Sequence, residues 1–345
     1  MNNLFVMHTQ YNLILSSGIT SRNKNAYNVL VVYAEFPVTD EYLNVLNKIY
    51  NKVIVVNDRF RTFSSTKEEL DFIRLCIKKC KEIRKIKFDN VYLSQERVFD
   101  LILFYTVKRK NKNVRCYNVE EDAYYSINNK FNDDNYKCNI TFTNKVKRFL
   151  KMIYVGHFYN YKECRYCYGM GGVYNGVNML FPHLARRELL NKERIEITKE
   201  EILYGVNALY SNKNCNYPSG ERYLVVFFDL INRYKNKDLV IKTVKELITN
   251  ALEQGKTIIL KYHPRETEKF TEFNSLNELD NVIPAEKVLY DLLDKEVEIL
   301  GNATTAVIVS AKLGYKVNSI CKIESPDNIK MHSAMTKMGI NCIEN

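Results

Sequence analysis

KTIILKYHPRE, residues 256–266, begins with the short apolar run Thr257–Leu260, which is typical of a buried strand in a parallel sheet. Lys261, His263 and Arg265 follow at once, and a proline ends the strand pattern. Two fixed cations and a titratable imidazole therefore stand at the carboxyl end of a strand, which is the edge of an open α/β sheet where ligands bind. This concentration of hydrogen-bond donors suits an anion, most simply a phosphate.

Short apolar runs alternate with helical patterns on both sides of this stretch. Strands are predicted at residues 4–7, 28–33, 52–56, 90–93, 114–119, 222–228, 257–260, 281–283, 296–300 and 316–321. Helices are predicted between most of them, and again at residues 145–154, 198–210 and 331–338. The alternation predicts an α/β protein with two Rossmann-like domains. We place them at 1–212 and 213–325, followed by a C-terminal helix and tail at 326–345.

Composition limits the kind of partner. The 345 residues include 51 Lys and Arg against 40 Asp and Glu, a net charge of +11 that suits an anionic partner such as a nucleotide or a membrane surface. The basic residues are scattered, so nucleic acid is not indicated. The nine cysteines lack the spacing of a disulfide framework, which predicts reduced thiols, and the lone Cys164–Cys167 CxxC motif does not predict a metal site. The sequence shows no signal peptide and no apolar run long enough to span a membrane, which predicts a cytoplasmic location.

Two further motifs follow predicted strands. Glu120-Glu121-Asp122 comes after residues 114–119, and repulsion between neighbouring carboxylates can raise the pKa of one so that it acts as a base. Taken alone, this motif is better explained as an acidic loop. Gly301–Thr305 (GNATT) joins a strand to a helix, and its backbone N–H groups, Asn302 and the hydroxyls of Thr304 and Thr305 are expected to bind a phosphate. The alternative is simple helix capping by Thr304 or Thr305.

Two Rossmann-like domains that face each other place their strand ends on one central cleft. Carboxylates on one wall and cations with hydroxyls on the other suit glycosyl transfer from a nucleotide sugar, with a base for the acceptor hydroxyl and a charge clamp for the departing phosphate.

The motifs resemble those of the bacterial sialyltransferases and polysialyltransferases of GT-B fold, the enzymes that act on capsule or lipooligosaccharide. That family carries an acidic pair followed by glycine, then a His-Pro motif, then a Ser/Thr pair. This chain has Glu121-Asp122-Ala123, His263-Pro264 and Thr304-Thr305 in the same order. Ala123 stands where the family has glycine.

The resemblance implies an inverting transfer of sialic acid from CMP-sialic acid to a hydroxyl of a terminal sugar, such as galactose, with no metal or other cofactor. It makes the C-terminal domain the donor side and the N-terminal domain the acceptor side. Glu121 would be the base and Asp122 its support. His263 would protonate or hydrogen-bond the leaving phosphate, which the two threonines would hold. Glu286 matches a position that binds the cytidine ribose.

Several alternatives stay open at this stage. Asp238 is the runner-up for the base, because some relatives take it from the second domain. The donor could be another CMP-activated nonulosonic acid or a different nucleotide sugar. A non-catalytic protein that binds an anionic glycan or a membrane surface is a third interpretation, but it leaves the three motifs unused. We expect a cytoplasmic enzyme at the inner face of the cell membrane, and the acceptor and linkage stay open.

Overall fold

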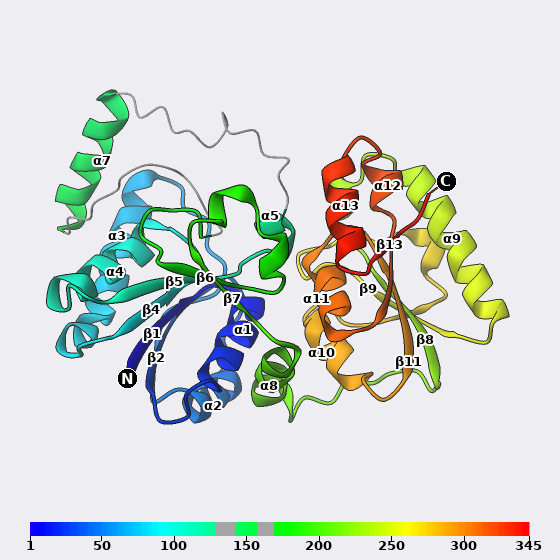
Figure 1. Cartoon of the computed structure of the whole chain (residues 1–345), viewed down its shortest axis with the longest axis horizontal. Helices are drawn as coiled ribbons and strands as arrows, with labels where there is room; N and C mark the ends of the chain where they lie inside the picture. Colours follow the sequence, from blue (N-terminus) through cyan, green and yellow to red (C-terminus); the bar gives the residue numbers. More distant parts are fainter. Residues whose placement is uncertain (128–141, 157–168, 345) are drawn as a thin grey trace. The chain divides into compact units, whose positions relative to one another are not determined.

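The computed structural model describes residues 1–127, 142–156 and 169–344. It divides into two compact units, each with its own parallel sheet (Figure 1). The first unit holds Met1–Glu121 and the described part of Phe131–Leu209. The second holds the described parts of Asp122–Lys130 and Tyr210–Asn345. The predicted α/β architecture with two parallel sheets is confirmed.

The first unit is built on a seven-stranded sheet of order β3-β2-β1-β4-β5-β6-β7, in which every pairing is parallel. Its strands are β1 (Asn2–Met7), β2 (Tyr27–Ala34), β3 (Lys52–Asp58), β4 (Asn90–Leu93), β5 (Arg115–Val119), β6 (Gly176–Met179) and β7 (Glu193–Glu196). Its α-helices are α1 (Gln10–Thr20), α2 (Asp40–Ile49), α3 (Thr66–Lys79), α4 (Val98–Lys110), α7 (Phe142–Val155) and α8 (Lys199–Tyr210).

The second unit is built on a six-stranded parallel sheet of order β10-β9-β8-β11-β12-β13. Its strands are β8 (Arg222–Phe227), β9 (Thr257–Lys261), β10 (Asn277–Glu278), β11 (Glu296–Gly301), β12 (Lys316–Ser319) and β13 (Asn341–Cys342). Its helices are α5 (Ala123–Ile127), α9 (Lys237–Glu253), α10 (Ala285–Asp291), α11 (Thr305–Leu313), α12 (Cys321–Glu324) and α13 (Ile329–Lys337). Residues 326–345 thus supply a helix and an edge strand to this unit.

Burial explains why the central strands read as continuous apolar runs. Both faces of β1, β2, β8 and β9 are covered, so every residue after the first of each strand is buried, rather than every second one. Helix starts follow local chemistry in the same way. The Ser65 hydroxyl accepts a hydrogen bond from the Glu68 N–H at 3.2 Å, as its position before α3 predicts.

Two strand predictions need correction, and four short strands were not predicted. Residues 281–283 are not a strand, because the Asp280 carboxylate accepts the Val282 N–H at 2.9 Å and closes a turn, which leaves Val282 exposed. The strand predicted at 316–321 ends at Ser319, and α12 begins at Cys321. β6, β7, β10 and β13 were not predicted, since each has only two to four residues, and β7 is a largely exposed edge strand without an apolar run.

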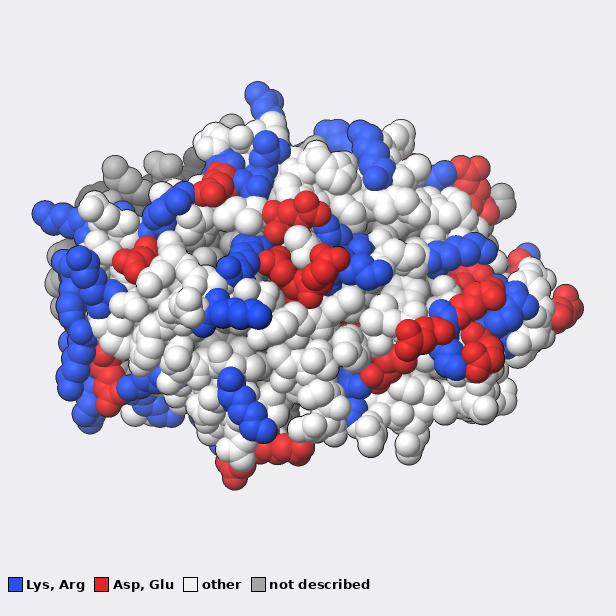
Figure 2. Space-filling model, turned by 60° about the horizontal axis from the view of Figure 1, so that its bottom comes forward, with Lys and Arg blue, Asp and Glu red and all other residues white. Residues whose placement is uncertain are grey.

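The structure also describes the state of the cysteines and the distribution of surface charge. The described cysteines are all free, and Cys164 and Cys167 lie outside the described residues. On the face drawn in Figure 2, Lys and Arg side chains are distributed with acidic side chains among them. None of the helices in the described ranges is both long enough and apolar enough to cross a bilayer.

Candidate functional site

The order of the strands in the second unit defines where its ligand edge lies. β9 and β10 extend the sheet on one side of β8, and β11, β12 and β13 extend it on the other, so the topology switches between β8 and β11. Lys261 and Gly301 both pair with Phe227, one on each side. Since neighbouring strands lie about 4.8 Å apart, the backbones of Lys261 and Gly301 are about 10 Å apart. The residues that follow them, His263 and Thr304, leave the same edge of the sheet.

The Gly301–Thr305 loop presents hydrogen-bond donors at this switch point. Thr304 is the N-cap residue of α11, yet no side chain caps the helix. The Thr304 hydroxyl is buried and has no hydrogen-bond partner among the residues that the structure describes. The first N–H groups of a helix have no partner within the helix, and the helix dipole makes that end positive. An unpartnered buried hydroxyl beside such an end is the arrangement expected of an anion site.

Gly301 lets β11 and α11 approach closely. A Cβ atom at this position would lie 2.7 Å from Cγ2 of Val307 and 2.8 Å from the carbonyl oxygen of Phe227. We therefore expect Gly301→Ala to lower the free energy of unfolding by about 1–3 kcal/mol. Urea unfolding measures this loss. Gly172→Ala is the control, because a Cβ there would meet nothing within 4 Å. Equal stability of the two variants would contradict this account of the loop.

The acidic motif reaches this loop through Asp122. The Thr305 hydroxyl donates a hydrogen bond to Oδ1 of Asp122 at 3.0 Å. Both residues belong to the second unit, and α5, which begins at Ala123, packs against α11. Two motifs that are 183 residues apart in the sequence are thus in direct contact.

His263 is half-buried two residues beyond the end of β9. Its Nδ1 accepts the Arg265 N–H at 3.1 Å, so in the neutral ring the hydrogen is on Nε2, which is the donor. Burial lowers the pKa of His263 from 6.5 to about 4. The Asp229 carboxylate raises this pKa, whereas the cations Arg265, Arg233 and Lys261 lower it. His263 is therefore a neutral hydrogen-bond donor near pH 7.

This pKa makes stability depend on pH. Between about pH 6.5 and 4 the unfolded chain binds the His263 proton and the folded chain does not, so protonation favours unfolding. The contribution of His263 to stability is therefore full above pH 6.5 and is lost as the pH falls toward 4. Urea unfolding at a series of pH values measures it as the difference between the wild type and His263→Gln. Parallel curves for the two proteins would contradict the lowered pKa.

The other predicted residues of this unit surround the same edge. Lys261 is buried, donates to the carbonyl oxygens of Tyr262 at 2.8 Å and Asn281 at 3.2 Å, and has its pKa lowered by burial to about 8. Glu286 is buried in the first turn of α10, where burial raises its pKa against the opposing effect of Lys261.

Three further predicted residues lie on the loops after the strands. Pro264 and Arg265 are exposed. The Asn302 side chain accepts the Ala303 N–H at 2.8 Å and so shapes the loop before α11. Asp238, the alternative base, is exposed in the first turn of α9.

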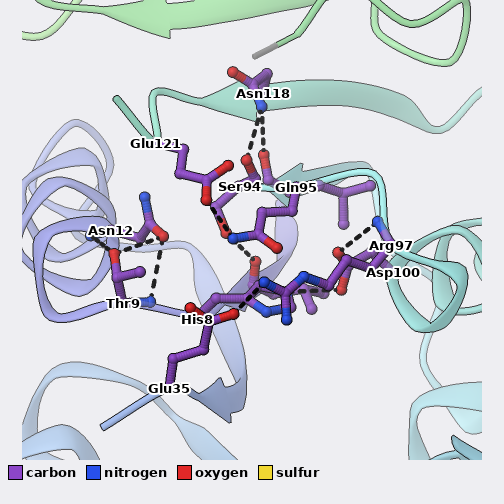
Figure 3. Close-up of polar contacts among 12 residues, drawn as sticks. His8, Thr9, Asn12, Glu35, Ser94, Gln95, Arg97, Asp100, Asn118 and Glu121 are labelled. Carbon is purple, nitrogen blue, oxygen red and sulfur yellow. Dashed lines mark hydrogen bonds and ion pairs between the residues drawn. The ribbon is translucent and has the colours of Figure 1, made fainter. Parts of the chain in front are cut away.

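In the first unit the topology switches between β1 and β4, and Glu121 follows β5, the strand next to β4. Figure 3 shows Gln95, from the end of β4, donating its side-chain amide to the Glu121 carboxylate. Gln95 was not predicted as a site residue, although it stands two residues after a predicted strand, which was the available signal. The contact orients one carboxylate oxygen of Glu121.

Two other polar residues near this edge are structural. His8, which directly follows β1, is fully buried, and its Nε2 lies 2.9 Å from Oδ1 of the equally buried Asp100 (Figure 3). Glu120 is also buried, and its carboxylate accepts the Leu180 N–H at 2.9 Å. Of the acidic run, Glu120 therefore supports the fold, whereas Glu121 and Asp122 are half-buried. Across the described ranges, no three His, Cys, Asp or Glu side chains are grouped as a metal ion requires.

Comparison with solved structures defines the class of the fold. A UDP-GlcNAc 2-epimerase from Neisseria meningitidis bound to UDP-GlcNAc matches 99% of this chain and 87% of its own, with a TM-score of 0.56 and 10% identity. The epimerase from Methanocaldococcus jannaschii matches 98% and 92%, with a TM-score of 0.55 and 14% identity. The GT-B domain of a sialyltransferase from Photobacterium damselae matches 99% and 100%, with a TM-score of 0.50 and 11% identity.

The predicted GT-B fold is therefore confirmed. At such identities the likeness shows the fold alone. No protein-family model and no curated protein matches the sequence.

Proposed function

We propose that this protein is an inverting sialyltransferase that moves sialic acid from CMP-sialic acid to a hydroxyl of a terminal sugar on a bacterial surface glycan. The observation that carries the proposal is the hydrogen bond between Thr305 and Asp122. It joins Asp122 of the acidic motif to Thr305 at the start of α11, on the sheet edge of the second unit that also bears His263. These are the three motifs in which the sequence resembles that family.

In the proposed reaction, the acceptor oxygen bonds to the anomeric carbon of sialic acid while the bond from that carbon to the CMP phosphate breaks. Glu121 removes the acceptor proton, and the departing phosphate keeps the electron pair. His263 donates a hydrogen bond from Nε2 to that phosphate, and Thr304 and the N-terminus of α11 hold it. Because positive and hydrogen-bonding groups meet the leaving charge, the step does not require a metal ion or another cofactor.

Further residues complete the donor site in this proposal. The Lys261 and Arg265 side chains add positive charge near the phosphate, and Glu286 binds the ribose hydroxyls, as the family resemblance implies. The buried Lys261 keeps its carbonyl partners and makes the strand end electropositive. Gly301, Asn302 and Pro264 shape the loops rather than contact the reacting atoms.

A second candidate keeps the fold and changes the donor. The UDP-GlcNAc 2-epimerases above share the fold, and one of them was solved with UDP-GlcNAc bound, so a UDP-sugar is an alternative to CMP-sialic acid. Another CMP-activated nonulosonic acid is a further alternative. A non-catalytic binder of anionic glycans would bind without a nucleotide, and its binding would collapse with salt.

Incubation with CMP-sialic acid and a panel of galactosides tests the proposal, with CMP release and product mass as the readouts. We expect CMP release that depends on the acceptor and a product heavier by one sialic acid residue. Parallel incubations with UDP-GlcNAc and with another CMP-nonulosonic acid distinguish the donors. If product forms only with one of these donors, that donor replaces CMP-sialic acid in the proposal. If no donor gives a product, the proposal is contradicted.

We place the proposed reaction in the cytoplasm, at the inner face of the cell membrane, where a surface glycan is built before export. The net charge of +11 favours contact with anionic lipids there.

A further inference from the structure

The outer side of α7 carries a row of exposed apolar side chains. Val146, Phe149, Leu150 and Ile153 recur at helical spacing and are 41%, 52%, 57% and 51% exposed. Together with Tyr154, they make up five of the fourteen large hydrophobic side chains that are exposed in the described residues. One helix of 14 residues therefore holds more than a third of them. Scattered exposed apolar residues are ordinary, but a contiguous row marks an interaction surface.

This row is not the side that attaches α7 to the fold. Met152 and Val155 pack on the core of the first unit, and α7 lies beside α3 (Figure 1). At 3.6 residues per turn, Val155 lies on the opposite side of the helix from Leu150 and Ile153, and Met152 lies opposite Leu150. The Tyr154 hydroxyl also donates to Asp71 of α3 at 2.6 Å. The helix is therefore held by one face and presents a second apolar face outward.

The charged residues of α7 itself all have one sign, and the Asp71 carboxylate of α3 lies at the Tyr154 edge of the row. The sequence of α7 contains four basic residues and no acidic residue. Lys147 is exposed and Lys151 is half-buried, and both lie beside the row on the side of Tyr154. Arg74 of α3 is 5.3 Å from the centre of the Tyr154 ring and adds a further cation at this edge.

We propose that α7 docks the protein on the surface of an anionic lipid bilayer. The helix lies in the plane of the interface, with Val146, Leu150 and Ile153 among the acyl chains and Lys147 and Lys151 at the level of the phosphates. Apolar residues on one face and lysines beside them are the pattern of interfacial helices. A second protein copy is a poorer occupant, because lysine is depleted in protein interfaces and two such rows would bring like charges together.

The proposed function includes a contact with the membrane, and α7 is the element to which we assign that contact. It does not rest on sialyl transfer, because vesicles without donor or acceptor test it. Loss of vesicle binding and loss of transfer are separate results.

Vesicle flotation measures the binding. We expect the protein to float with phosphatidylcholine vesicles that contain phosphatidylglycerol, less at high salt, and not with phosphatidylcholine alone. Leu150→Gln/Ile153→Gln removes the apolar contact without loss of helix propensity and should weaken binding roughly tenfold or more. Lys147→Glu/Lys151→Glu reverses the charge and should weaken it roughly tenfold or more.

The chain offers matched controls in its second unit. Leu252 and Ile329 are 50% and 75% exposed, so Leu252→Gln/Ile329→Gln tests whether any exposed apolar pair contributes. Lys242→Glu/Lys245→Glu, on the exposed side of α9, tests net charge alone. Both controls should bind as the wild type does. Unchanged binding by the α7 variants, or equal losses in the controls, would overturn the proposal. A dimer without lipid that the α7 variants abolish would overturn it in favour of a second copy.

Discussion

His263→Ala is expected to lower kcat roughly 10²–10³-fold, the loss that follows removal of one donor from a charge-stabilising site. In the proposed reaction, sialic acid leaves as an oxocarbenium-like species, so most of the barrier would lie in separating it from the phosphate. Nε2 of His263 is the donor, because Nδ1 is occupied by the Arg265 N–H. The effect should appear in kcat rather than in KM, since the phosphate gains charge only as the bond breaks.

His263→Gln separates hydrogen bonding from proton donation. The pKa of about 4 makes the ring neutral near pH 7, so we expect it to act as a hydrogen-bond donor. The glutamine amide can also donate, and this variant should retain more activity than His263→Ala. Steady-state kinetics with CMP-sialic acid measure both. Near-normal turnover in His263→Ala would remove His263 from the mechanism, and equal losses in both variants would favour proton transfer.

Glu121→Gln is expected to lower transfer by roughly 10²–10⁴-fold, the usual contribution of a general base, and to leave CMP affinity unchanged. The substitution keeps the size of the side chain, and its amide oxygen can still accept the Gln95 hydrogen bond. The substitution therefore removes the proposed base without removing the contact that orients it. Transfer rates and calorimetric titration with CMP measure the two effects.

Asp238→Asn is the matched comparison for Glu121→Gln. Asp238 is exposed on the first turn of α9, and we expect its asparagine variant to keep transfer within a few-fold of the wild type. An inactive Asp238→Asn variant beside an active Glu121→Gln variant would assign the base to the second unit and reject Glu121.

The fold could be predicted where local sequence carried the signal. Thr257–Leu260 reads as a buried strand because both of its faces are covered, and it forms the core of β9. Asn281–Ile283 misled the prediction, because an apolar pair was read as a strand where the Asp280 carboxylate closes a turn. β7 was missed because an exposed edge strand needs no apolar run.

The candidate site could be predicted in its parts but not in its contacts. Strand ends identified Lys261 and the Gly301–Thr305 loop, since the carboxyl edge of a parallel sheet collects such residues. The hydrogen bond from Thr305 to Asp122 spans 183 residues and arises only from tertiary packing. The burial of His8 against Asp100 could not be predicted either, because a polar residue after a strand is typical both of a ligand-binding residue and of one half of a buried pair.

Titration of CMP and of cytidine by calorimetry tests most directly whether the second unit holds a nucleotide phosphate. The wild type should bind CMP roughly tenfold or more tightly than cytidine, because charge-assisted hydrogen bonds hold the phosphate. Thr304→Val should lose most of that difference while keeping its stability, since the hydroxyl it removes has no partner among the described residues. Equal affinities for CMP and cytidine in the wild type, or an undiminished difference in Thr304→Val, would contradict the account.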